Sequence, residues 1–113
     1  MKLDFSQMEE QVMKEFKGGR GELRARMHVD SANKIMWATL PPGSYVGLHT
    51  HEGDSEIVYI VSGTGKAQYE DGYEPLAPGD CHYCPPGHSH RLINDSDGDL
   101  TFFAVVPRHG DGG

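Results

Sequence analysis

Three histidines and one glutamate stand at spacings that could bring them to a single metal ion. His49 and His51 are two residues apart in a segment with strand character, so both rings should project from the same face. A four-residue turn, Glu52 to Ser55, should then reverse the chain before Glu56 begins the next strand. Because side chains on neighbouring antiparallel strands lie about 5 Å apart, we expect the Glu56 carboxylate to meet both imidazoles at one divalent ion.

A fourth ligand would come from His88 or His90, which follow Pro85-Pro86-Gly87 at the start of a later strand. The spacing alone does not choose between them. One histidine on a strand is more often a hydrogen-bonded polar residue than a ligand. Two imidazoles on one face followed by a carboxylate are harder to explain in that way, because burying them together without a cation leaves polar groups unpaired. The pattern therefore favours a metal site.

The elements that must position these residues are short strands. Runs rich in Val, Ile, Tyr, Phe and Thr alternate with turns supplied by 15 Gly and 7 Pro, which predicts a mainly β protein. The expected strands are Glu22 to Val29, Lys34 to Leu40, Tyr45 to His51, Glu56 to Ser62, Gly65 to Glu70, Asp80 to Cys84, Ser89 to Ile93 and Leu100 to Val106. So many short strands are typical of a jelly roll or barrel, which leaves few exposed sheet edges.

The chain of 113 residues has the length of one domain. We expect an N-terminal arm or short helix over residues 1–20, the barrel over 21–107 and a flexible tail over 108–113. Ser6 and Glu9 form a capping box that favours a short helix. A segment of this length gains little from helix propensity, so an extended arm that pairs with the barrel or with a second subunit is the alternative.

Charge and hydropathy narrow the choice of partners. The net charge is −7 and Lys and Arg form no basic run, so nucleic acid is not expected as a partner. The longest apolar stretch, Phe102 to Val106, is far too short to span a bilayer, and the polar N-terminus does not resemble a secretory signal. We therefore expect no membrane partner and a cytoplasmic location.

The two cysteines, Cys81 and Cys84, form a C-x-x-C pair that could indicate redox chemistry or half of a zinc site. Their segment has strand character and precedes two prolines, whereas a redox pair normally begins a helix. Positions three apart on a strand point to opposite faces, so the thiols would not converge on one metal. We expect ordinary buried side chains.

The spacing of these residues closely resembles the two motifs of the cupin superfamily. The first motif reads Gly43, five residues, His49-Thr50-His51, four residues, Glu56, six residues and Gly63. The second reads Gly79, five residues, Pro85, one residue, Gly87, two residues, His90, three residues and Asn94. The resemblance covers about half of the chain and implies an all-β double-stranded β-helix, the jelly-roll barrel. It also identifies His90 as the fourth ligand beside His49, His51 and Glu56, and leaves His88 outside the site.

Cupins bury the metal in a cavity that opens at one end of the barrel, and the sequence suggests which side chains would line it. Strand alternation places Val58 and Ile60 on the face of Glu56. The resemblance implies that Met36, Phe102, Ala104 and Val106 also face inward. These six residues predict a mostly apolar substrate-binding surface, unless Arg24, Arg26, Gln68 or Tyr69 also faces the cavity.

Three neutral imidazoles and a carboxylate suit several first-row divalent metals, and we favour one Mn, Fe, Ni or Zn ion per chain. Four protein ligands on an octahedral ion leave two adjacent positions for a small molecule. We expect a metal-dependent enzyme acting on a small organic molecule, with dioxygenase-type oxidation favoured by the apolar lining. The alternatives are a Lewis-acid isomerase or lyase acting on a sugar acid or carbonyl compound, and a noncatalytic module that binds a metal or a small ligand.

Two further comparisons refine these expectations. Small cupins that linearise unsaturated uronates resemble this chain but use a carboxylate on the final strand, and Leu100 to Val106 contains none. Cupins often pair their barrels, and Ile57, Tyr59 and Val61 should face away from Glu56. These residues could pack between the two sheets or be covered by a second copy, and we expect a homodimer.

Overall fold

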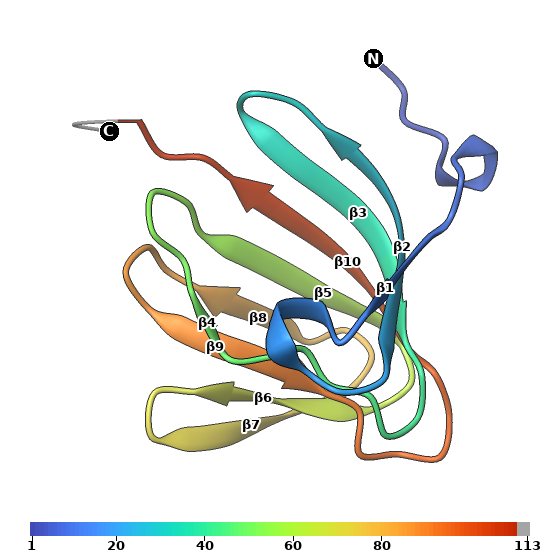
Figure 1. The fold of residues 1–113 in the computed structure, drawn as a ribbon, viewed down its shortest axis with the longest axis vertical. Coiled ribbons are helices and arrows are strands. Elements are labelled where there is room, and N and C mark those ends of the chain that lie inside the picture. Colours follow the sequence, from blue (N-terminus) through green and yellow to red (C-terminus); the bar gives the residue numbers. More distant parts are fainter. Residues whose placement is uncertain (111–113) are drawn as a thin grey trace.

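The computed structural model describes residues 1–110 as two antiparallel sheets folded against each other (Figure 1). The larger sheet has the strand order β1-β2-β3-β10-β5-β8, and the smaller has the order β4-β9-β6-β7. The strands are β1 (Gln11–Lys14), β2 (Glu22–Val29), β3 (Asn33–Leu40), β4 (His49–Thr50), β5 (Glu56–Ser62), β6 (Gly65–Tyr69), β7 (Gly72–Leu76), β8 (Cys81–Cys84), β9 (Ser89–Ile93) and β10 (Leu100–Pro107). This architecture confirms the all-β jelly roll.

Alternating side chains build the core between the sheets. In β5, Glu56, Val58 and Ile60 are buried, whereas Ile57 and Tyr59 are exposed on the outer face. The same alternation continues across β10 and β3, so one apolar face of the larger sheet packs toward the smaller sheet. The core residues are Leu23, Ala25, Met36, Ala38, Leu40, Val46, Val58, Ile60, Ala67, Leu76, Leu92, Leu100, Phe102 and Ala104.

The expected strand between Tyr45 and His51 is much shorter than the sequence indicated. Only β4 forms a ladder, whereas Tyr45 makes isolated bridges to Arg20 and Ile93. Gly47 explains part of the irregularity, because a side chain there would collide with the backbone carbonyl of Lys17 at 1.8 Å. The chain can approach the 3-10 helix η2 (Phe16–Gly18) closely only without that side chain.

The N-terminal segment takes the extended alternative. A single 3-10 turn, η1 (Phe5–Gln7), is capped by Asp4, whose side chain accepts a hydrogen bond from the Ser6 N–H at 3.0 Å. The following β1 pairs with β2 and becomes an edge of the larger sheet. Pairing with an existing strand satisfies backbone groups that a short isolated helix would hold only weakly.

One strand was absent from the sequence expectations. β7 contains Pro75 and four exposed residues, so it has neither the alternation nor the composition of a central strand. It lies at the outer edge of the smaller sheet, where proline is tolerated because one side of the strand needs no ladder partner. Of the tail expected to be flexible, residues 111–113 lie outside the described residues. No helix within residues 1–110 has the length and apolar character needed to cross a membrane.

Candidate metal centre and its pocket

The four residues singled out by the sequence come together between the two sheets. His49 lies in β4 directly opposite His90 in β9, both in the smaller sheet. His51 follows β4, and its backbone N–H still donates to the carbonyl of His88 at 3.0 Å. Glu56 is the first residue of β5 and therefore belongs to the larger sheet.

This arrangement corrects one step of the sequence argument. Glu56 was expected on a strand adjacent to the one bearing His49 and His51, but the ladder partner of β4 is β9. The turn over residues 52–55 instead carries the chain from one sheet to the other, and β5 pairs with β10 and β8. The carboxylate thus reaches the imidazoles across the interior of the barrel.

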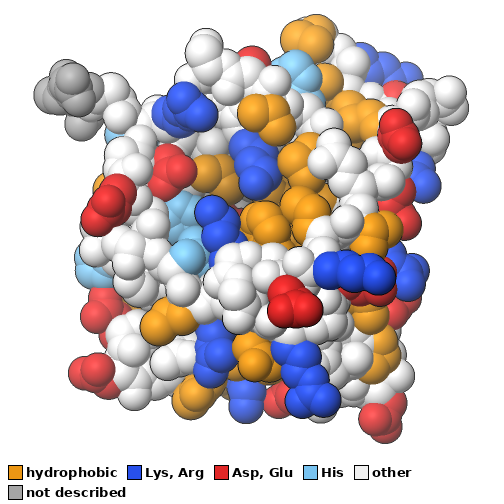
Figure 2. All heavy atoms as spheres, in the orientation of Figure 1, with side chains coloured by type: hydrophobic (Ala, Val, Ile, Leu, Met, Phe, Trp, Pro, Cys, Tyr) orange, Lys and Arg blue, Asp and Glu red, His pale blue; other side chains and the backbone are white. Residues whose placement is uncertain are grey.

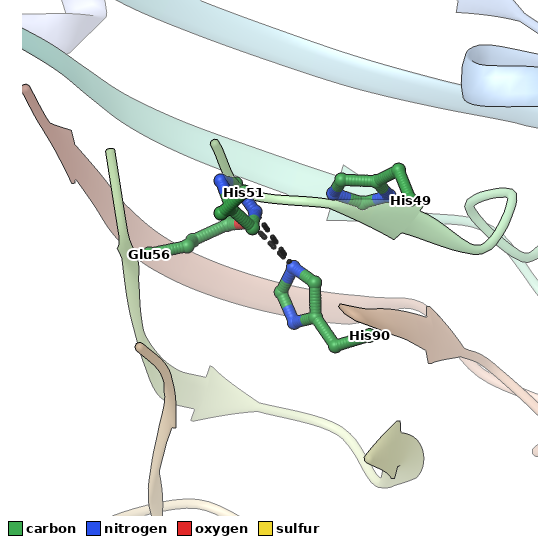
Figure 3. A group of neighbouring side chains, drawn as sticks. All are labelled: His49, His51, Glu56 and His90. Atoms are coloured by element: carbon green, nitrogen blue, oxygen red, sulfur yellow. Dashed lines mark hydrogen bonds and ion pairs between the residues drawn. The ribbon is translucent and has the colours of Figure 1, made fainter. Parts of the chain in front are cut away.

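The side chains converge closely enough to share one ion (Figure 3). One ligand atom from each of His49, His51, Glu56 and His90 can be chosen so that all four lie within 4.8 Å of one another. His51 Nε2 lies 3.0 Å from His90 Nε2, and a carboxylate oxygen of Glu56 lies 3.2 Å from the first and 2.9 Å from the second. Such separations suit donors arranged around a single small cation.

Hydrogen bonds on the outer side of the rings hold two of the imidazoles in the orientation that a metal requires. His49 Nδ1 lies 2.7 Å from the carbonyl of Gly47, and His51 Nδ1 lies 2.8 Å from a carboxylate oxygen of Asp54. Both oxygens are acceptors, so each Nδ1 carries the proton and donates it. Nε2 of a neutral ring then has a free lone pair directed into the cluster.

The electrostatics of the cluster also favour a cation. Burial opposes the charge on Glu56, but the imidazoles of His51 and His90 at its carboxylate outweigh burial and hold the pKa of the carboxyl below its usual range. The hydrogen bond to Glu56 raises the pKa of His51, whereas burial lowers the pKa of His49. Positive charge beside the buried carboxylate, such as a proton on His51, is therefore favoured. A divalent ion could replace that proton and engage all the facing lone pairs, so the donor set fits a metal.

A pocket of about 470 Å³ opens beside the cluster, and all four residues contribute to its wall. Three of the six residues expected to bind substrate, Met36, Phe102 and Val106, also line it. Val58, Ile60 and Ala104 face the same interior but are fully buried in the core and do not reach the wall. Additional apolar surface comes from Phe16, Leu23, Met27, Val29, Val46 and Leu92.

The pocket is more polar than expected, because Lys17, Lys34 and Arg108 contribute to its wall. Burial lowers the pKa of Lys34, which shows that its ammonium group is partly removed from water. Figure 2 shows basic, histidine and hydrophobic side chains adjoining one another in the middle of the face it presents. Arg24 and Arg26, which might have supplied charge, do not line the pocket.

The sequence contained a usable signal for two of these cations. Lys34 is two residues before Met36, and Arg108 is two residues after Val106, so each shares the face of a residue expected to point inward. Lys17 had no such signal, because η2 and its approach to the barrel were not expected. The predicted lining ended at Met36 and Val106, so it left out the next inward-facing position on each side, and both of these positions carry a cation.

The remaining motif residues separate clearly from the site. His88 is half-exposed and contacts Tyr69 and Glu70. Cys84 is buried, and burial raises the pKa of its thiol to about 11, whereas Cys81 is exposed. The two cysteines point to opposite faces of β8, as expected, but only Cys84 is the buried side chain that we predicted for both.

Comparison with known proteins gives a consistent identification. Residues 36–106 match the family model described as a cupin domain. The chain is 38% identical over 97 residues to the oxalate-binding protein of Thermotoga maritima, covering 80% of this chain and 79% of that protein. It is 30% identical over 88 residues to the β-alanine degradation protein BauB of Pseudomonas aeruginosa, covering 74% and 92% of the two chains.

Solved structures agree with the family match. A predicted oxalate decarboxylase from Thermotoga maritima superposes with a TM-score of 0.89 at 32% identity, covering 96% of this chain and 99% of that one. A sugar phosphate isomerase of the cupin superfamily from Silicibacter pomeroyi has a TM-score of 0.80 at 24% identity, covering 96% and 76%, and shows the shared fold. With the jelly roll and both histidine motifs in place, this chain belongs to the cupin family.

Proposed function

We propose that this cupin holds one divalent metal ion through His49, His51, Glu56 and His90 and uses it to bind a small carboxylate of the oxalate type. The observation that carries the proposal is the convergence of these four side chains at the wall of a pocket that also bears cationic groups. Mn, Fe, Ni and Zn all suit three imidazoles and a carboxylate. The bound metal would act as a Lewis acid that accepts carboxylate oxygens.

Charge supports an anionic ligand. The pocket wall contains four acidic side chains, of which Glu56 belongs to the metal cluster and Glu52 is exposed. Asp54 is engaged by His51, and Asp30 accepts hydrogen bonds from the backbone N–H groups of Ala32 and Asn33 at 2.8 Å. Within residues 1–110, no ion pair of 4.0 Å or less involves Lys17, Lys34 or Arg108. These cations therefore remain available to a ligand, and charge-assisted hydrogen bonds to a carboxylate are among the strongest in proteins.

Two considerations favour a short ligand: the number of open positions on the ion, and the ligand named for two relatives. A dicarboxylate with adjacent carboxyl groups can occupy two neighbouring positions on one metal, which matches an octahedral ion with four protein ligands. The relatives from Thermotoga maritima are named an oxalate-binding protein and a predicted oxalate decarboxylase. Both names are consistent with a short dicarboxylate as the ligand of this chain.

A second candidate function is oxygen-dependent oxidation of the bound molecule. The observation that favours it is the apolar part of the pocket wall, where Met27, Met36, Leu92, Phe102 and Val106 adjoin the candidate ligands. Such a wall admits dioxygen and offers few groups to pair with phosphates or many hydroxyls. A Lewis-acid isomerase acting on a sugar acid is less well supported, because no acidic residue of β10 lines the pocket within the described residues.

The outer face of the larger sheet supports a homodimer. Trp37, Phe103 and Tyr59 are cross-strand neighbours on this face, and Ile57 is opposite Tyr83 on the adjoining strand pair. Ile57, Tyr59 and Tyr83 are between 39% and 51% exposed, so the last two strands of the larger sheet present a patch of aromatic and aliphatic surface. A second copy would cover this face and an edge strand at the same time.

We expect the purified wild-type protein to contain about one metal ion per chain by elemental analysis. Removing an imidazole ligand, in His51→Ala or His90→Ala, should weaken binding at least tenfold and lower the metal content accordingly. His88→Ala is the matched control, because this nearby histidine faces away from the cluster and should leave the content unchanged. Full occupancy in the His90→Ala variant would show that the ligand set is wrong.

Oxalate should bind to the metal-loaded protein in calorimetric titrations, and Lys34→Gln should weaken that binding about tenfold by removing a partly buried positive charge. Metal content should not change. Lys66→Gln is the control, because Lys66 lies in β6 outside the pocket wall. Neutral oxamide should bind far more weakly than oxalate; equal affinities would contradict a charge-selective site.

If the bound molecule is oxidised, the Fe- or Mn-loaded protein should consume dissolved oxygen when oxalate or another short carboxylate is added. An oxygen electrode measures this directly, and the Zn-loaded protein is the control because Zn does not change oxidation state. If the protein binds oxalate but takes up no oxygen in any metal form, oxidation is rejected and the protein acts as a binding module.

Light scattering should give twice the chain mass of 12.4 kDa for the wild type at micromolar concentration. Placing a charge in the proposed interface, as in Tyr59→Lys, should yield the monomer because the charge would be desolvated on association. Tyr73→Lys is a matched control, since Tyr73 is a similarly exposed tyrosine on the edge strand β7 of the other sheet. A wild type with the monomer mass would contradict the dimer.

A further inference from the structure

A fourth histidine, itself buried, lies directly behind the three histidines of the candidate metal centre. His82 lies in β8 opposite Val58 and is only 2% exposed. Its ring stacks on that of His90, with centroids 5.1 Å apart and planes inclined by 18°. It is not one of the four residues that can meet at the ion, and the proposed function gives it no role.

His82 is the middle member of a hydrogen-bonded series that leads from the surface to the centre. A carboxylate oxygen of Glu74 lies 2.9 Å from His82 Nδ1, and His82 Nε2 lies 2.9 Å from His90 Nδ1. Glu74 is a half-exposed residue of the edge strand β7. The series therefore joins β7, β8 and β9, and so connects the smaller sheet with the larger one.

The chemistry of the first member determines the direction of every hydrogen bond in the series. A carboxylate only accepts, so His82 Nδ1 carries the proton and donates it to Glu74. Nε2 of a neutral His82 is then an acceptor, and the facing His90 Nδ1 must carry the proton that it receives. His90 Nε2 is left with a lone pair for an ion, which would lie between this atom and the Glu56 carboxylate oxygen 2.9 Å away.

The other two candidate imidazole ligands obtain the same tautomer from simpler partners. His49 donates to the backbone carbonyl of Gly47, and His51 donates to the carboxylate of Asp54. His90 has neither a carbonyl nor a carboxylate within hydrogen-bond distance of Nδ1 in the described residues, because His82 occupies that position. Without His82, nothing in the described chain would select the correct tautomer of His90.

We propose that His82 and Glu74 are positioning residues, which hold His90 in the Nδ1–H form and direct its Nε2 toward the metal. The inference rests on the proposed metal function, and it assigns a role to two residues outside the four ligands. Outer partners of this kind typically change metal affinity by about 10- to 100-fold when they are removed.

The matched variants are His82→Leu and His82→Gln, which are similar in size. Leucine removes the acceptor for His90, whereas the side-chain oxygen of glutamine can still accept a hydrogen bond. With Zn²⁺ and a competing chelator, His82→Leu should raise the dissociation constant about 10- to 100-fold, and His82→Gln should recover most of that loss. Equal affinities of the two variants, or a wild-type affinity in His82→Leu, would overturn the proposal.

A second pair of variants tests the same series at a half-exposed position, so that the test does not depend on whether the His82 variants fold. Glu74→Ala removes the outer acceptor at a half-exposed position, and Glu74→Gln keeps a side-chain oxygen there. We expect Glu74→Ala to weaken Zn²⁺ binding several-fold and Glu74→Gln to retain most of the affinity, because the orientation of His82 depends on an acceptor at this point. Unchanged binding in Glu74→Ala would reject its part in the series.

The tautomers can be measured directly in the Zn²⁺-loaded protein. Long-range proton–nitrogen correlation spectra at pH 8 should show His82 as the neutral Nδ1–H form, which accepts at Nε2 the hydrogen bond from His90. A His82 with its proton on Nε2 could not accept from His90 and would overturn the proposal. A wild type that binds no Zn²⁺ would contradict the proposed function itself, whereas normal Zn²⁺ binding with His82 in the Nε2–H form would reject only the role of His82.

Discussion

The structure depends on one electrostatic constraint: ring nitrogens and a carboxylate from two sheets face a common point inside the barrel. Nε2 of His51 and Nε2 of His90 are only 3.0 Å apart, and both lone pairs cannot face each other at that distance without a proton or a cation between them. Because Glu56 comes from the larger sheet and the histidines from the smaller one, the same cation would also hold the two sheets together.

The protein prepares this point before any ion binds. Gly47 and Asp54 accept from the outer nitrogens of His49 and His51, and both acceptors lie within three residues of the ring they orient. Both acceptors therefore belong to the same short stretch of chain as β4. His90 is different, since its outer partner lies on β8 and depends in turn on β7. Folding of the whole barrel is therefore needed to orient the last ligand.

The sequence predicted the convergence of His49, His51, Glu56 and His90 well and their surroundings less well, for physical reasons. Motif spacing located the histidines and Glu56 because strand alternation and turn residues act over short distances. It could not show that Glu56 lies in the opposite sheet, since that depends on which strands pair. It also missed β7, an exposed edge strand containing Pro75, and with it the partner of His82. Contacts that depend on which strands pair cannot be read from the local spacing of residue types.

The proposed choice of ligand depends on the charge at the pocket rather than on the fold. Structures under 25% identical share the jelly roll with this chain and include a sugar phosphate isomerase, so the barrel alone does not select a ligand. The net charge of −7 would repel a dicarboxylate at long range, but salt screens that field beyond about 8 Å. A bound ion and Lys34 would act over shorter distances and partly out of water, where Coulombic attraction is strongest. In the proposed function, these local cations would govern recognition even though the chain as a whole is acidic.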